Sequence, residues 1–189
     1  MDNEDRRRFL LSLPAVAAAI AATRPAAAQA ADPQNTLYLD TKDGRITIRL
    51  HPDLAPKHVA QIKALVKQHF YDGIVFHRVI DGFMAQTGDP TGTGTGKSSL
   101  PNLKAEFSST PFKRGTVGMA RSQDPDSANS QFFICFDDAS SLNGKYTVIG
   151  EVTSGMDVVD KIKKGSQSNN GAVTNPDKIV KMRLASDAG

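Results

Sequence analysis

Residues 76–89 decide the fold, and they read Phe76-His77-Arg78-Val79-Ile80-Asp81-Gly82-Phe83-Met84-Ala85-Gln86-Thr87-Gly88-Asp89. Two short strand-like runs flank an Asp-Gly turn, which is the pattern of a β-hairpin. The stretch holds a guanidinium, a carboxamide and large apolar side chains, but no acid–base pair, nucleophile or metal-ligand spacing. Such a surface can grip a peptide and hydrogen-bond its backbone. It therefore favours a reaction that changes the conformation of a bound peptide over one that breaks a covalent bond.

Residues 1–30 are predicted to be an export signal and are set aside from the fold. Three arginines at positions 6–8 precede an apolar run, 9–22, and Ala28-Gln29-Ala30 has the small-x-small form of a cleavage site. The run is shorter than the roughly 20 residues that span a bilayer, and Pro14 interrupts it, so stable membrane insertion is not expected. The arginine pair followed by Phe9-Leu10 resembles the twin-arginine pattern, which is favoured over general secretion and over a buried helix. We expect a periplasmic or secreted protein with residues 31–189 as one domain.

The composition argues against several classes of protein. The formal net charge is +3, and no basic run is interleaved with aromatic residues, so a nucleic-acid partner is not expected. A single cysteine, Cys135, excludes an intramolecular disulfide, and its apolar neighbours indicate a buried, inert thiol. The domain is expected to be a monomer.

Alternating and helical patterns predict eight strands and two helices. Most strands are joined by short polar turns rather than helical crossovers, which favours an antiparallel barrel or sandwich over a parallel α/β sheet. The first helix begins at Pro56 and runs toward His69, and the second is predicted from Ser154, with Asp157 as its capping partner, to Gly165. The predicted strands are 36–40, 45–50, 75–80, 83–86, 116–120, 131–136, 146–151 and 179–184.

Two irregular stretches, 88–109 and 122–130, are too long for simple connections and are expected to frame a site. The first contains Gly92-Thr93-Gly94-Thr95-Gly96-Lys97-Ser98, which suggests a phosphate-binding loop. The first glycine of that motif would fall at Thr91, and no buried parallel strand precedes the segment. A Gly/Thr surface loop is therefore the favoured interpretation.

The histidines and serines indicate neither metal nor hydrolase chemistry. The four histidines form no pair at i, i+4 or i, i+2 spacing, and no G-x-S-x-G motif is present. His77 lies on the opposite strand face from Arg78, where a structural hydrogen-bonding role is favoured over general-base work. No metal and no cofactor are predicted.

Arg78 stands out because it lies in an otherwise apolar strand and shares a face with Phe76 and Ile80 by period two. An arginine on the buried face of a strand destabilises the fold unless an opposite charge pairs with it. A structural salt bridge from Arg78 to Asp81 or Asp89 is therefore one interpretation. The other is a peptide pocket formed with side chains near loop ends, namely Phe83, Met84, Gln86, Gln131 and Phe133.

Four motifs together resemble the cyclophilin-type peptidyl-prolyl isomerases. Their order and spacing match the family over nearly all of residues 31–189, and the Met-Ala-Arg form and Tyr146 are similar to bacterial members. The motifs are Phe-His-Arg-Val-Ile-x-Gly-Phe-Met-x-Gln-x-Gly-Asp at 76–89, Gly118-Met119-Ala120-Arg121, Asn129-Ser130-Gln131-Phe132-Phe133-Ile134 and Leu142-Asn143-Gly144-Lys145-Tyr146-Thr147-Val148.

The resemblance implies a mainly β fold, a closed eight-stranded antiparallel barrel capped by two α-helices, and isomerase activity without a cofactor. It implies that Arg78 is the catalytic guanidinium, which stabilises the twisted imide. The implied substrate-binding residues are Phe83, Met84, Phe133 and Leu142 around the proline, Tyr146 at the pocket edge, Gln86 on the substrate backbone, Ala120 and Arg121 beside the extended peptide, Gln131 in support, and His77.

The implied partners are proline-containing polypeptides, and folding envelope proteins in particular. A non-catalytic proline-peptide-binding module or chaperone that uses the same groove is the alternative, and a purely structural barrel is a third interpretation. The guanidinium favours the enzyme, because binding alone would not require it. Ser141 stands where the family often has a tryptophan that contributes to cyclosporin binding, so strong inhibition by cyclosporin is not expected.

Overall fold

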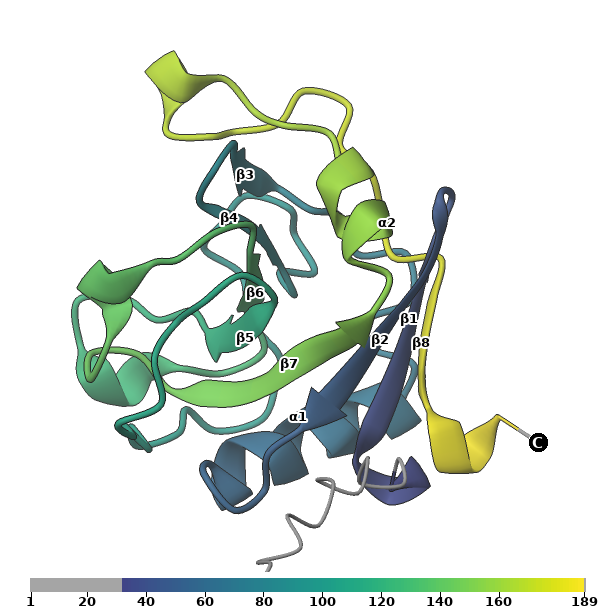
Figure 1. Ribbon diagram of the computed structural model, residues 1–189, viewed down its shortest axis with the longest axis vertical. Coiled ribbons are helices and arrows are strands. Elements are labelled where there is room, and N and C mark those ends of the chain that lie inside the picture. The colour runs from purple at the N-terminus through teal and green to yellow at the C-terminus, as the bar shows by residue number, and fades with distance from the viewer. Residues whose placement is uncertain (1–31, 189) are drawn as a thin grey trace, which may run out of the picture. The chain divides into compact units, whose positions relative to one another are not determined.

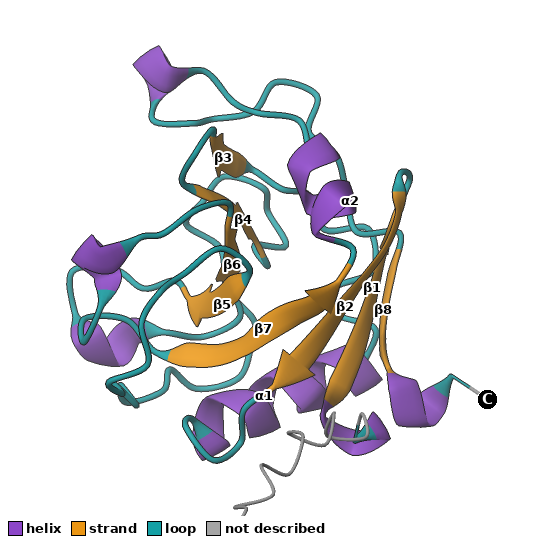
Figure 2. Cartoon of the chain, in the orientation of Figure 1, coloured by secondary structure: helices purple, strands orange, loops and turns teal. Residues whose placement is uncertain are grey.

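The computed structural model describes residues 32–188, and within them it confirms the eight strands and two helices (Figure 1 and Figure 2). The predicted export signal, residues 1–30, lies outside the described residues. Within 32–188, no helix is long and apolar enough to cross a membrane. The elements are β1 (Thr36–Thr41), β2 (Gly44–Leu50), α1 (Pro56–Lys67), β3 (Arg78–Ile80), β4 (Met84–Thr87), β5 (Thr116–Met119), β6 (Phe132–Cys135), β7 (Val148–Ser154), α2 (Met156–Lys161) and β8 (Lys181–Leu184).

The eight strands of the described chain form one antiparallel sheet in the order β3-β4-β6-β5-β7-β2-β1-β8. The predicted closed barrel is wrong, because the end strands β3 and β8 do not pair with each other and the sheet is an open half-barrel. Residues 163–179, here called the gap segment, lie against β3 instead (yellow-green in Figure 1).

The gap segment satisfies the free edge of β3 without being a strand. The Val79 N–H donates to the Gly171 carbonyl at 2.8 Å, and the Phe76 N–H donates to the Asp177 carbonyl at 2.8 Å. Asn170 and Gly171 have φ values of 49° and 78°, so the chain turns here and cannot continue as a strand. These bonds protect a sheet edge that would otherwise expose unpaired backbone groups.

Each face of the sheet packs its own apolar cluster. Along β6, Phe132 and Ile134 enter the main core, while Phe133 and Cys135 enter a second cluster on the other face. The α1 helix covers the main core with residues at helical spacing. The second cluster buries Cys135 and raises the pKa of its thiol to about 12, which agrees with the predicted inert thiol. Its buried members are Met84, Phe112, Phe133, Cys135, Ala139 and Val148.

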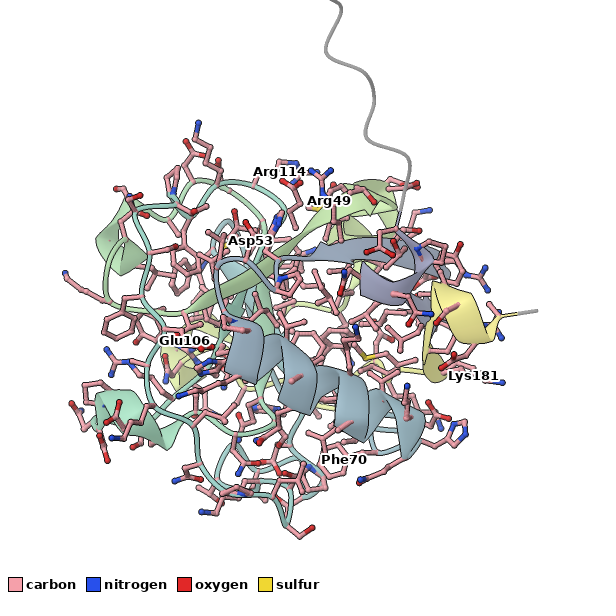
Figure 3. All side chains as sticks on the ribbon, turned by 90° about the horizontal axis from the view of Figure 1, so that it is seen from below. Arg49, Asp53, Phe70, Glu106, Arg114 and Lys181 are labelled. Carbon is pink, nitrogen blue, oxygen red and sulfur yellow. The ribbon has the colours of Figure 1, made fainter. Side chains whose placement is uncertain are left out.

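The start of α1 is held by a carboxylate far away in the sequence. Pro56 begins the helix as predicted, and Glu106 accepts hydrogen bonds from the Lys57 and His58 N–H groups, each at 3.1 Å, and contacts the His58 ring at 2.7 Å. Figure 3 shows Glu106 beside one end of this helix. Burial raises the pKa of the Glu106 carboxyl, but these hydrogen bonds outweigh burial, so the pKa is lowered overall. The carboxylate therefore caps the helix.

The second helix differs from the prediction at both ends. It ends at Lys161 rather than near Gly165, and Ser154 is the last residue of β7 instead of a helix cap. The N-cap is Gly155, whose φ of 89° requires glycine. A Cβ atom there would lie 2.3 Å from the Arg45 carbonyl oxygen, so close packing against β2 also excludes a side chain.

Candidate active site

Three neighbouring strand pairs set one row of side chains across the sheet. Arg78 lies opposite Gln86, Gln86 opposite Phe133, and Phe133 opposite Gly118. Residues directly opposite each other in an antiparallel sheet project from the same face. The predicted guanidinium, carboxamide and aromatic ring therefore stand side by side on the face of the second cluster.

A hollow of about 170 Å³, here called the small pocket, opens over this row. We call Phe83, Met84, Phe133, Leu142 and Tyr146 its apolar wall, and Arg78 and Gln86 its polar wall. It brings together most of the residues predicted from the sequence: Arg78, Phe83, Met84, Gln86, Ala120, Arg121, Phe133, Leu142 and Tyr146.

Aromatic packing fixes the apolar wall of the small pocket. The Phe133 ring stacks on Phe112 with centroids 5.8 Å apart and meets Tyr146 edge to face at 5.9 Å. The Arg121 guanidinium lies 4.5 Å from the centroid of the Tyr146 ring. Gly118 leaves room for these rings, because a Cβ atom there would lie 2.6 Å from both Phe112 and Phe133. Any larger residue at position 118 would displace the wall.

The Arg78 guanidinium is held by neutral oxygen atoms. Its Nε donates to the Asn170 main-chain carbonyl at 3.0 Å, and its Nη2 donates to the Asn170 side-chain oxygen at 3.0 Å. Its Nη1 donates to Gln86 Oε1 at 3.2 Å. Burial lowers the pKa of the guanidinium and the neighbouring Tyr146 raises it, but an arginine remains charged in either case. These contacts engage three of the five N–H donors of the side chain.

Arg78 forms no ion pair with a carboxylate in the described chain, 32–188. Asp89, one of the two carboxylates considered from the sequence, instead accepts hydrogen bonds from Thr91 and from glycines of its own loop. The interpretation of Arg78 as one half of a structural salt bridge is therefore wrong. The positive charge and two N–H donors remain available at the pocket.

Two carboxamides connect the guanidinium to the 88–97 loop. Gln86 Nε2 donates to Gln131 Oε1 at 2.8 Å, and Gln131 Nε2 donates to the carbonyls of Gly94 and Gly96 at 3.1 and 2.8 Å. Asp89 holds the same glycines by accepting their N–H groups at 2.6 and 3.1 Å. These amides bind the protein's own carboxylate, which supports the surface-loop interpretation over a phosphate loop. Burial raises the pKa of the Asp89 carboxyl, but the loop hydrogen bonds outweigh burial and lower it overall.

A larger hollow of about 420 Å³ adjoins the small pocket and shares Gln86, Ala120 and Arg121 with it. The two irregular stretches form its walls, as expected from the sequence. Asn129 joins them, because it accepts the Ser98 N–H at 3.0 Å and donates to the Leu100 carbonyl at 2.8 Å. Gln131, predicted to support the site, lines the larger hollow and accepts a hydrogen bond from Gln86, which lines both.

His77 is the predicted site residue that lines neither hollow. Its side chain is buried, and a Cβ atom on Gly94 would lie 3.6 Å from its ring. Neither ring nitrogen has a hydrogen-bond partner within the described residues, and burial lowers the pKa of the imidazole. The ring therefore packs beneath the 88–97 loop, away from the pocket and without the hydrogen-bonding role expected from the sequence.

Comparison with known proteins assigns the chain to a family. The model of the cyclophilin type peptidyl-prolyl cis-trans isomerase/CLD family matches residues 36–184, which contain every residue of the small pocket. The chain belongs to the cyclophilin-type peptidyl-prolyl cis-trans isomerases. Two of its relatives illustrate the names that similar proteins carry. A probable peptidyl-prolyl cis-trans isomerase of Brucella suis is 59% identical over 192 residues, covering 95% of this chain and 98% of that protein. A peptidyl-prolyl cis-trans isomerase of Helicobacter pylori is 44% identical over 131 residues, covering 67% and 79%.

Solved cyclophilin structures have the same fold as this family member. The cyclophilin AquaCyp293 from Hirschia baltica matches with a TM-score of 0.74 and 30% identity, over 82% of this chain and 76% of that one. A cyclophilin-type isomerase of Cryptosporidium parvum, crystallised in the presence of the dipeptide Ala-Pro, matches with a TM-score of 0.72 and 27% identity, over 79% and 98%. The small pocket is the candidate site of this cyclophilin.

Two residues of this cyclophilin site were not predicted from the sequence. Phe112 stacks behind Phe133, and Asn170 binds the guanidinium from 92 positions away along the chain. The Asn-Asn-Gly run at 169–171 is typical of a left-handed turn, but nothing in it indicates a contact with Arg78. Within 32–188, no group of three or more His, Cys, Asp and Glu side chains could hold a metal ion.

Proposed function

We propose that Arg78 accelerates X–Pro isomerisation by donating a hydrogen bond to the prolyl nitrogen as the peptide bond twists. In a planar peptide the nitrogen lone pair is delocalised into the carbonyl, and rotation meets a barrier of roughly 18–20 kcal/mol. Twisting localises the pair on nitrogen and makes the nitrogen an acceptor. A cationic donor aimed there binds the twisted state better than either planar isomer, which lowers the barrier.

One observation supports this mechanism above the others: a charged guanidinium, which forms no ion pair within residues 32–188, lines the same pocket as the apolar side chains of Met84 and Phe133. The apolar wall, with Phe133 and Met84 at its base, would hold the proline ring, while Gln86 would hold the backbone before it. Clamping both sides confines rotation to one bond. Neither a nucleophile nor an acid–base pair is needed, because no covalent bond breaks.

We also propose that the substrates are exported proteins that fold in the envelope or outside the cell. The twin-arginine-like pattern of residues 1–30 supports this location. An extended polypeptide would pass Ala120 and Arg121 into the larger hollow, and the domain would act as a monomer without a cofactor. Mass spectrometry of the exported protein tests the location, and a mature N-terminus far from Ala31 would overturn the predicted boundary.

A protease-free isomerisation assay on a proline peptide tests the catalytic proposal. The wild-type chain should accelerate exchange, and Arg78→Ala should lower kcat/KM by about 100- to 1,000-fold with an unchanged circular dichroism spectrum. Arg114→Ala is the matched control for kcat/KM, because this arginine pairs with Asp160 and the Phe136 carbonyl and lines neither hollow. A wild-type chain that binds the peptide but leaves the exchange rate uncatalysed would support the non-catalytic binding module instead.

A further inference from the structure

Asn170 contacts the Arg78 guanidinium through two different atoms. Its main-chain carbonyl accepts from Nε and its side-chain oxygen accepts from Nη2, each at 3.0 Å. Gln86 accepts from Nη1 on the other side. A planar guanidinium held at all three nitrogen atoms has one orientation, and one N–H on each Nη stays free for the substrate.

We infer that Asn170 is a positioning residue, which aims the Arg78 guanidinium at the small pocket. The inference rests on the proposed catalytic role of Arg78. Asn170 itself does not line the small pocket, so it acts through the arginine.

The backbone of the gap segment places Asn170 firmly against β3. The Val79 N–H donates to the Gly171 carbonyl at 2.8 Å, and the Val79 carbonyl accepts from the Gly165 N–H at 2.9 Å. A Cβ atom on Gly171 would lie 2.5 Å from the Ile80 side chain, so the turn packs directly on the strand. Asn170 is exposed, but its position relative to Arg78 is set by these neighbouring contacts.

An asparagine suits both the backbone conformation at position 170 and the contact with Arg78. Its φ and ψ of 49° and 34° lie in the left-handed region, which asparagine tolerates better than most residues. This conformation lets the main-chain and side-chain oxygens meet the same guanidinium. Within the described chain, the Asn170 side chain hydrogen-bonds Arg78 and no other residue. Removing its carboxamide therefore removes that one contact.

Three variants separate positioning from a general structural effect. Asn170→Gly keeps the backbone conformation and the main-chain carbonyl but removes the side-chain oxygen. Asn170→Asp keeps an acceptor oxygen at the same place. Asn175→Gly is the matched control, because Asn175 lies in the same gap segment with a φ of 51° and is also exposed.

We expect Asn170→Gly to lower kcat by about 3- to 10-fold while the Kd of a proline peptide stays within about 2-fold. Asn170→Asp should stay within about 2-fold of the wild-type kcat, and Asn175→Gly should match wild type. In NMR spectra of the free protein, the Arg78 side-chain N–H resonances should shift in Asn170→Gly and not in Asn175→Gly. If Asn170 only stabilised the fold, Asn170→Gly would neither lower kcat selectively nor shift the Arg78 side-chain resonances.

Several outcomes would overturn the inference. A wild-type kcat in Asn170→Gly would do so, as would an equal loss in Asn175→Gly. Combining Asn170→Gly with Arg78→Ala should cause no further loss beyond Arg78→Ala alone, so a further loss also counts against it. Failure of the proposed function is seen separately, because Arg78→Ala would then keep near-native turnover whatever residue stands at 170.

Discussion

The two walls of the small pocket are held by different forces. Phe133 and Met84 are 5% and 2% exposed and belong to the second apolar cluster of the sheet. Arg78 and Gln86 are partly exposed and are oriented by hydrogen bonds that reach the 88–97 loop and the gap segment. The shape of the pocket therefore follows from packing on the sheet, whereas the direction of the guanidinium depends on irregular segments. Substitutions in the two walls should have different consequences.

The largest effect on stability is expected from the apolar wall. Phe133→Ala removes a ring that packs against both Phe112 and Tyr146, so the free energy of unfolding should fall by roughly 3–5 kcal/mol and peptide binding should weaken. Denaturant unfolding measures the loss. Phe107→Ala is the control, because that ring is 43% exposed and its loss should change stability little. Full stability combined with lost activity in Phe133→Ala would break the distinction between the walls.

The polar wall should show the opposite pattern. Gln131→Leu removes the link from Gln86 to the carbonyls of Gly94 and Gly96, so kcat/KM should fall by about 10-fold. The free energy of unfolding should change by no more than about 1 kcal/mol, because the site is partly open to water. Isomerase and denaturation assays on one preparation measure both quantities. Gln68→Leu, an exposed change just after α1, should alter neither.

An effect smaller than that of the apolar wall is expected from acid acting on the 88–97 loop. The pKa of Asp89 is lowered in the folded protein, so its contribution to stability is complete above its ordinary value near 4 and is lost as the pH falls through the folded value. Asp89→Asn cannot lose this contribution by protonation. Its free energy of unfolding should be about 1–2 kcal/mol lower at pH 7 and should depend less on pH below about 4. Equal acid slopes for the two proteins would contradict this role of Asp89.

The row of site residues could be predicted because strand geometry is local. Period-two alternation determines which side chains share a face, so Arg78, Met84 and Gln86 could be placed on one side of a hairpin from the sequence. The resemblance then added Leu142 and Tyr146 from another part of the chain, and the structure places both in the small pocket. The eight strands and the start of α1 were predictable for the same local reason.

The features that were missed depend on contacts between distant segments. The closed barrel was implied by the resemblance to the family, but β3 has three residues and its free edge bonds to turns around Gly171. Asn170 carries no local sign of its partner. His77 shares the motif of the pocket, yet alternation turns its ring beneath Gly94. The start of α2 at Gly155 depends on the close approach of β2, which no pattern near Ser154 reveals.

The gap segment has a consequence for the order in which a newly made chain becomes active. All residues of the small pocket have been synthesised once Tyr146 has been added, so the pocket side chains precede Asn170 in the growing chain. Asn170 follows later, and its contact with Arg78 closes a loop 92 positions long, which places it among the entropically slow contacts of folding. The groove can thus be present in the chain before the guanidinium is held. The proposed positioning of Arg78 by Asn170 therefore makes catalytic competence depend on a part of the chain that is synthesised after the pocket.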